Sequence, residues 1–149
     1  MKYDIKPYNN EKVKGFYIWN KPTFFVKKDD NRYDEYVQYK KKHGFSPDEM
    51  WDLKTNIAIF ISPRLKEFRL DIIDLYNYPN CDDCKKEFVE NLDKMIFAFD
   101  AYLKDDFYVP DEYLEKYKDD GESFAREAYW MDVKEGLNLF AEYFNSFCW

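Results

Sequence analysis

The chain has 149 residues, of which 46% are hydrophobic and 36% charged, and its formal net charge is −7. This composition excludes a wholly disordered chain, and the length predicts a single domain, residues 1–149, that buries about two-thirds of its unfolded surface. No apolar run approaches about 18 residues and the first residues lack a hydrophobic signal region, so we expect neither a membrane span nor secretion.

Charge divides the chain into two regions. Residues 1–45 carry eleven Lys and Arg against six Asp and Glu, a net charge of +5, whereas residues 46–149 carry twelve against twenty-four, a net charge of −12. Aromatic residues make up 21% of the chain. A well-buried Phe contributes roughly 1.5 to 3 kcal/mol, so these rings can supply a substantial core. The sequence leaves open whether the surplus rings form core or interface.

The first predicted elements lie in the basic region. Residues 15–19 and 23–27 are aromatic and β-branched runs on either side of a turn at residues 20–22. This pattern is typical of a small hairpin or a pair of extended segments. Residues 31–42 place tyrosines at helical spacing, which predicts a short helix, and Gly44 is available for a left-handed C-cap after it.

The clearest helical pattern runs from residue 46 to residue 76. Ser46, Pro47 and Glu49 form a helix-start signature, in which the serine caps, the proline suits the first helical position and the glutamate completes a capping box. Pro63 disrupts the hydrogen bonding of a regular helix at a cost of about 3 kcal/mol. We therefore expect one helix kinked at Pro63, or two segments bent there. Apolar residues at steps of three and four define one face: Leu53, Ile57, Ile61, Leu65, Phe68, Ile72 and Leu75.

Further segments complete the expected architecture. After a turn at residues 77–80, a helix begins at Asp82 or Asp83 and runs to about residue 106. Another segment starts at Asp111, and a last helix spans about 122–147. Two apolar stripes accompany these helices: Phe88, Leu92, Met95, Phe99 and Leu103, then Trp130, Val133, Leu137, Phe140, Phe144 and Phe147. The sequence thus predicts a mainly α protein, a helical bundle with a central Pro-kinked helix and a small N-terminal aromatic extended or hairpin annex.

No residue pattern defines a catalytic or cofactor site. Cys81 and Cys84 have the CxxC spacing of zinc or redox sites, but the remaining candidate ligands, Cys148 and His43, each stand alone. His43 ends a predicted helix after two lysines, which favours a solvated helix end over a catalytic base. We expect no catalytic residue, no cofactor and no metal ion. The alternative is a nucleotide- or metal-binding protein or hydrolase with a pocket between helices near Pro63.

The stretch from residue 105 to 122 is the candidate interaction surface. Its eight acids accompany two lysines, with tyrosines between them. Such a row of negative charges can imitate phosphates and steer a basic protein partner, although a solvated loop explains it equally well. Direct nucleic-acid binding by the basic residues 27–42 is disfavoured, because the acidic remainder repels that ligand. The candidate residues are Asp105, Asp106, Tyr108, Asp111, Glu112, Tyr113, Glu115, Tyr117, Asp119, Asp120 and Glu122.

Three motifs share a distinctive word order: GFSPDEMWDL at residues 44–53, IFISPRLKEF at 59–68 and LDKMIFAF at 92–99. Together with the opening residues 3–8, they resemble a family of small uncharacterised tailed-bacteriophage proteins. The resemblance implies a phage product in the host bacterial cytoplasm and brings no catalytic residues. With the acidic stretch, it favours a non-enzymatic protein that binds and inhibits or redirects a host protein, such as a nucleic-acid-dependent anti-phage defence factor. Homo-oligomerisation stays open.

Overall fold

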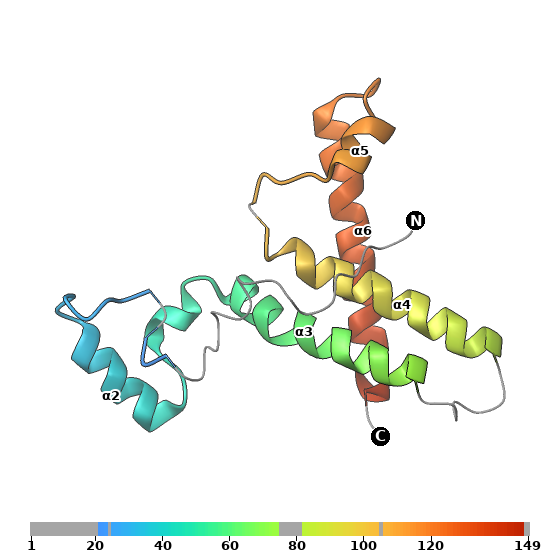
Figure 1. Cartoon of the computed structure of the whole chain (residues 1–149). Helices are drawn as coiled ribbons and strands as arrows, with labels where there is room; N and C mark the ends of the chain where they lie inside the picture. The colour runs from blue at the N-terminus through green and yellow to red at the C-terminus, as the bar shows by residue number, and fades with distance from the viewer. Residues whose placement is uncertain (1–20, 24, 75–81, 105, 148–149) are drawn as a thin grey trace. The chain divides into compact units, whose positions relative to one another are not determined.

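The computed structural model describes residues 21–23, 25–74, 82–104 and 106–147. Within these ranges the chain forms five α-helices and two short 3₁₀ helices, and it contains no β-strand (Figure 1). The prediction of a mainly α helical bundle is confirmed. The described residues belong to two compact units, which we call the N-terminal unit, residues 21–60, and the C-terminal unit, residues 61–147. A single cooperative domain stays a prediction from chain length.

In the N-terminal unit, a glycine turn separates helix α2 from the 3₁₀ helix η2. Helix α2 spans Tyr33–His43 and ends at Gly44, whose φ of 84° lies in the left-handed region. Glycine adopts this φ without the steric cost of a side chain, as the predicted C-cap requires. Helix η2 spans Pro47–Met50, and the predicted capping box of Ser46 and Glu49 is present at its start.

The long helix begins later than the sequence suggests. Helix α3 spans Leu53–Asp74, and it is Asp52 that caps it, because the Thr55 N–H donates to the Asp52 carboxylate at 3.4 Å. The capping box therefore starts only the 3₁₀ turn that precedes α3. Pro63 is buried inside α3, and the helix continues on both sides of it.

The apolar stripe predicted for this helix is only partly its buried face. Leu65 and Ile72 are buried as expected, but Leu53 and Ile57 are 55% and 46% exposed. Leu75 lies outside the described residues. The buried residues in the first two turns of α3 are instead Asn56, Ala58 and Ile59. Because these occupy a different sector of the helix, the start of α3 presents apolar side chains to solvent.

The predicted N-terminal hairpin lies largely outside the described residues, as does the turn at 77–80. Residues 25–27 form no strand. The backbone N–H groups of Phe25 and Val26 instead donate to the carboxylate of Asp48, at 2.7 and 2.9 Å. A side chain in η2 thus holds this segment in place of a partner strand.

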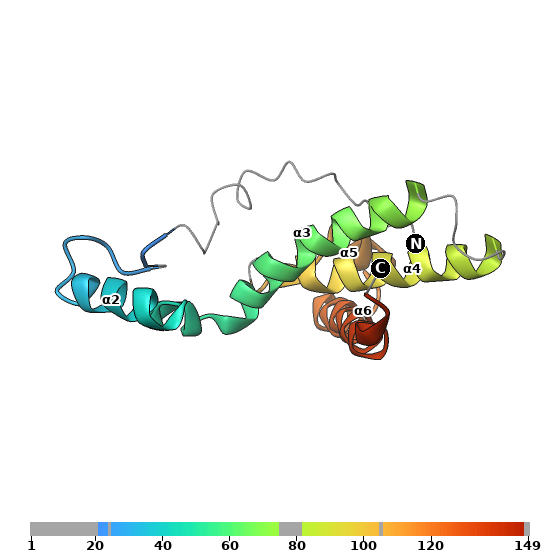
Figure 2. The same ribbon diagram turned by 90° about the horizontal axis from the view of Figure 1, so that it is seen from below.

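The C-terminal unit contains α4 (Asp82–Ala101), α5 (Asp111–Lys116), α6 (Glu122–Glu142) and η3 (Phe144–Ser146). The three helix starts agree with the prediction. The predicted ends were too late: α4 stops at Ala101, and α6 gives way to η3. Helix α4 crosses α6, and α5 packs beside the first part of α6 (Figures 1 and 2).

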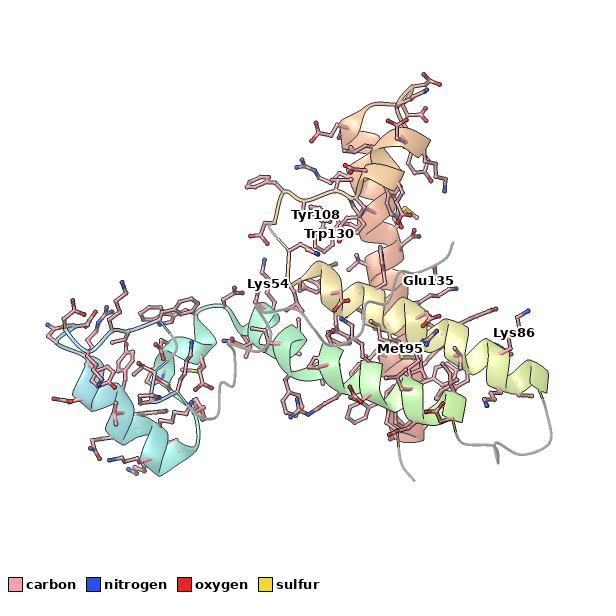
Figure 3. All side chains as sticks on the ribbon, in the orientation of Figure 1. Lys54, Lys86, Met95, Tyr108, Trp130 and Glu135 are labelled. Carbon is pink, nitrogen blue, oxygen red and sulfur yellow. The ribbon has the colours of Figure 1, made fainter. Side chains whose placement is uncertain are left out.

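Gly136 sets the distance between α4 and α6. A Cβ atom added to Gly136 would lie 2.2 Å from the carbonyl oxygen of Lys94 and 2.6 Å from the Cβ of Ala98. Any side chain at this position would push the helices apart, so glycine permits a close backbone approach. Met95 is fully buried where the two helices cross (Figure 3).

Small and aromatic side chains build the core between α4, α5 and α6. Its buried members are Ala98, Ala101, Val109, Tyr113, Ala125, Tyr129 and Val133. The Phe97 ring meets Tyr129 edge-on, with ring centroids 5.6 Å apart, and burial raises the pKa of Tyr129. The predicted α4 stripe is buried at Phe88 and Phe99. Many of the surplus rings of this unit therefore form core.

Hydrogen bonds and ion pairs connect the later turns of α3 to α4. The Ser62 hydroxyl donates to the Asp100 carboxylate, and the Lys66 ammonium pairs with the same carboxylate at 2.7 Å. Arg69 makes a two-pronged contact with Asp93. These contacts satisfy charged groups that the helix packing partly removes from water. In the described part of the chain, no helix is long and apolar enough to cross a membrane.

Candidate interaction surface

The predicted interaction residues lie at the end of the C-terminal unit that α5 and the start of α6 form (Figure 1). Asp105 lies outside the described residues. The remaining acids are all exposed, and we call them the acidic face: Asp106, Asp111, Glu112, Glu115, Asp119, Asp120 and Glu122.

Few acidic-face carboxylates form an ion pair within the described residues. Glu122 pairs with Arg126 at 3.0 Å, one helical turn away on α6. Such exposed pairs contribute little to stability, typically about 0.3 to 0.5 kcal/mol. Five carboxylates make no ion pair or hydrogen bond with other described residues: Asp111, Glu112, Glu115, Asp119 and Asp120. Their charges are available to a partner.

The pKa of Lys116 is raised by a hydrogen bond and in part by the acidic groups around it. A hydrogen bond to Tyr117 is the main cause that raises the pKa of Lys116. The negative charges of Asp132 and Glu112 raise it further. The lysine stays charged, but Lys116 and Lys118 are too few to balance these acids, so the surface keeps a negative excess.

Tyr113 does not belong to this surface, contrary to the prediction. Its side chain is 1% exposed, and its hydroxyl donates to the Asp132 carboxylate on α6. Helical periodicity explains the error, because Tyr113 points into the core while Asp111 and Glu112 face solvent. The neighbouring Tyr117 is half-buried and meets the Phe124 ring at 5.2 Å.

Exposed rings flank the acidic face. Phe107 is 75% exposed, Phe124 49% and Tyr108 42%, and Figure 3 labels Tyr108. The Arg126 guanidinium lies 5.8 Å from the Phe107 ring centroid, so the residue that pairs with Glu122 also contacts this ring. The sequence reading missed Phe107 and Phe124. For Phe107 the sequence held a signal: it follows two aspartates in a loop, where no helix face can bury it.

The buried carboxylate of the N-terminal unit has a structural role. One Asp48 oxygen accepts the two N–H groups of Phe25 and Val26, and the other accepts the Ser46 hydroxyl. Both Asp48 and Ser46 are fully buried. A carboxylate whose oxygens are occupied by donors in this way holds the fold together and has no access to a substrate proton.

The other candidate positions are dispersed. His43 is exposed at the end of α2, with its ring 4.2 Å from that of Tyr39. Cys84 is exposed in α4, whereas Cys81 and Cys148 lie outside the described residues. Across residues 21–23, 25–74, 82–104 and 106–147, no group of three His, Cys, Asp or Glu side chains could hold a metal ion.

Comparison of the chain with protein-family models, with curated proteins and with solved structures gave no match. The charge and exposure of the surface residues are therefore the basis for the functional conclusion.

Proposed function

We propose that this protein is a non-enzymatic, phage-encoded interaction protein that binds a host protein through the acidic face and the rings beside it. It acts in the host cytoplasm and inhibits or redirects its partner. The partner presents a basic surface, as a nucleic-acid-dependent anti-phage defence enzyme does. The phage setting comes from the resemblance of the three sequence motifs.

The observation that carries this proposal is the set of five exposed carboxylates that form no ion pair with other residues in the described part of the chain. Exposed unpaired charge adds nothing to folding, but it raises the rate at which an oppositely charged protein is captured, by roughly 10 to 1,000-fold. At physiological salt a charge acts over about 8 Å. Carboxylates gathered on α5 and its following loop can therefore act together on one partner surface.

The framework beneath the carboxylates is fixed before binding. The buried Tyr113 anchors α5 on α6 through its ring and its hydroxyl. Asp111 and Glu115, one helical turn apart on α5, point to the same side. A surface already ordered in the free protein loses less entropy on binding, which favours affinity.

The rings supply the apolar part of the contact. Interface centres are depleted of charge and enriched in aromatic side chains, which carry much of the binding energy. Phe107, with three-quarters of its surface exposed beside Arg126, is positioned for this role. The acids then steer and orient the partner, while the ring provides burial.

A pull-down from bacterial host lysate with two charge-matched variants tests the proposal. The first variant neutralises Asp111, Glu112, Glu115, Asp119 and Asp120 to Asn or Gln. The second neutralises five exposed acids elsewhere on the C-terminal unit: Glu67, Asp71, Asp74, Glu87 and Glu90. We expect the first variant to lose the partner and the second to retain it. Equal recovery by both variants would contradict a role of the acidic face.

Native mass spectrometry of the same freshly purified protein tests the alternative. A nucleotide or metal ion that stays bound would favour a small-ligand protein or hydrolase with a pocket near Pro63. The interaction protein is expected to appear at the mass of its chain alone or of its assemblies.

A further inference from the structure

The N-terminal unit exposes large apolar side chains that its own helices do not cover. Exposed fractions between 46% and 55% occur at five positions close together in sequence or in contact. We call them the N-terminal apolar patch: Phe25, Met50, Trp51, Leu53 and Ile57. Contiguous apolar surface rimmed by polar residues marks a protein interface far more often than an isolated exposed residue does.

Trp51 lies at the centre of this patch. The Phe25 ring is nearly parallel to it, with an interplanar angle of 6° and ring centroids 6.0 Å apart. Tyr36 meets it edge-on at 6.4 Å, and the Arg32 guanidinium lies 5.4 Å from its ring centroid. The Asp48 carboxylate accepts a hydrogen bond from the backbone N–H of Phe25, which fixes the position of this residue beside Trp51. Trp, Tyr and Arg are the residue types that dominate binding energy at interfaces.

The start of α3 extends the patch. Leu53 and Ile57 are one helical turn apart and therefore share a face, and Met50 precedes Leu53 by three residues. The buried residues Asn56 and Ile59 lie on a different side of the helix.

The area of the patch fits one side of a stable dimer. A large side chain offers about 150 to 250 Å² when fully exposed, so five that are about half exposed present roughly 400 to 600 Å². A standard interface covers about 800 Å² per partner, of which about 57% is apolar. The patch alone therefore supplies roughly the apolar share that one copy must contribute.

The charge of this unit permits contact with its own copy. Residues 21–60 carry eight Lys and Arg against seven Asp and Glu, whereas the described residues 61–147 carry eleven against twenty. Two copies of a nearly neutral surface meet without net repulsion. Two copies of the acidic C-terminal unit would repel each other.

We propose that the N-terminal apolar patch is the interface of a homodimer, in which the same patch of two copies meets across a two-fold axis. Self-complementary contact of this kind is the commonest way in which soluble proteins associate. The patch shares no residue with the acidic face. The dimer goes beyond the proposed host interaction and does not depend on it.

Sedimentation velocity tests this proposal with the full chain. From about 1 to 100 µM, a range in which weak interfaces of standard size assemble, the wild-type protein should pass from monomer to dimer. The double variant Leu53→Gln, Ile57→Gln should raise the dissociation constant at least tenfold. Its matched control is Leu70→Gln, Met131→Gln, two exposed apolar residues of the C-terminal unit, and this control should dimerise like the wild type.

The salt dependence of dimerisation distinguishes contact through the apolar patch from a charge-driven contact. Between about 50 and 500 mM salt, dimerisation through the apolar patch should not weaken, whereas pairing between oppositely charged units should weaken strongly. The single variant Trp51→Gln gives an independent measurement if the double variant unfolds. The proposal is overturned by a wild-type protein that stays monomeric over the whole range, by unchanged dimerisation of Trp51→Gln and the double variant, or by dimerisation that salt abolishes.

Discussion

The two units hold their helices together in different ways. The N-terminal unit is built around a buried carboxylate, Asp48, which binds backbone N–H groups 22 and 23 residues away. The C-terminal unit instead interlocks small and aromatic side chains around Gly136 and Tyr113. A short unit has little interior, so the N-terminal unit buries Val26, Ala58 and Ile59 but leaves larger side chains such as Trp51 on its surface.

This difference also separates the two proposed surfaces. In the C-terminal unit, a packed core leaves charge outside on the acidic face, with exposed rings such as Phe107 and Phe124 beside it. In the N-terminal unit, where a polar contact organises the fold, apolar side chains such as Trp51 and Leu53 lie outside without a comparable excess of acids. The aromatic surplus of the sequence therefore serves as core and as candidate interface in the C-terminal unit, and as candidate interface in the N-terminal unit.

The largest effect is expected from Asp48→Ala. The substitution removes the acceptor of the Phe25 and Val26 N–H groups and of the Ser46 hydroxyl, and each hydrogen bond to a charged group is worth about 1.5 to 3 kcal/mol, so the loss should be at least about 4.5 kcal/mol. Hydrogen exchange followed by mass spectrometry should show faster exchange over residues 21–60, with residues 82–147 unchanged. Equal loss of protection in both units would mean that the chain unfolds as the one cooperative domain its length predicts.

Gly136→Ala should destabilise the C-terminal unit. Its Cβ would overlap the Lys94 carbonyl oxygen, and relief of such overpacking costs about 2 to 3 kcal/mol. Denaturant unfolding monitored by circular dichroism measures the loss. The control Glu127→Ala, at an exposed position of the same helix, should change stability by no more than about 0.5 kcal/mol. A stable Gly136→Ala protein would refute the close approach of α4 and α6.

Tyr113→Phe should have a smaller effect on the same unit. It keeps the buried ring and removes only the hydroxyl that donates to the part-buried Asp132 carboxylate, at a cost of about 1.5 kcal/mol, the lower end for a bond to a charged group. Tyr117→Phe, at the half-buried neighbour, serves as the matched comparison and should be nearly neutral. Chemical denaturation of both variants decides whether Tyr113 anchors α5; equal stabilities would argue against it.

The smallest effect concerns the exposed pair of Asp30 and Arg32. The hydrogen bonds that Arg32 donates lower the pKa of Asp30 to about 2 from its ordinary 3.8. Because the folded pKa is lowered, the contribution of the pair is present above pH 3.8 and is lost as the pH falls through about 2. Carboxyl NMR titration should show this midpoint, and Arg32→Gln, which removes the side-chain donors but keeps the backbone N–H, should raise it toward 3.8. An unchanged midpoint in the variant would exclude Arg32 as the cause.

Local signals were read correctly from the sequence. Gly44 closes α2, Ser46 and Glu49 form their capping box, and α4 buries its stripe as predicted. Each of these depends on residues within about one or two helical turns of one another, which sequence spacing reports directly.

The errors concern contacts between distant residues. Period alone does not tell an inward stripe from an outward one, so Leu53 and Ile57 were assigned to the core. Tyr113 was grouped with the acids around it, although its partner Asp132 lies on another helix. Gly136 had a readable signal, because a glycine inside a helical pattern costs about 1 kcal/mol and needs a packing reason. No pattern in the sequence indicates the hydrogen bond between the Phe25 N–H and the Asp48 carboxylate.

The most direct test of the account is the rate at which the recovered host partner associates with the protein, measured by biolayer interferometry against salt concentration. For the wild type, and for the variant neutralised at Glu67, Asp71, Asp74, Glu87 and Glu90, the rate should fall at least tenfold between about 50 and 500 mM salt. For the variant neutralised at Asp111, Glu112, Glu115, Asp119 and Asp120, it should be low at every salt concentration. Identical rates and salt dependence for the two variants would contradict binding through the acidic face.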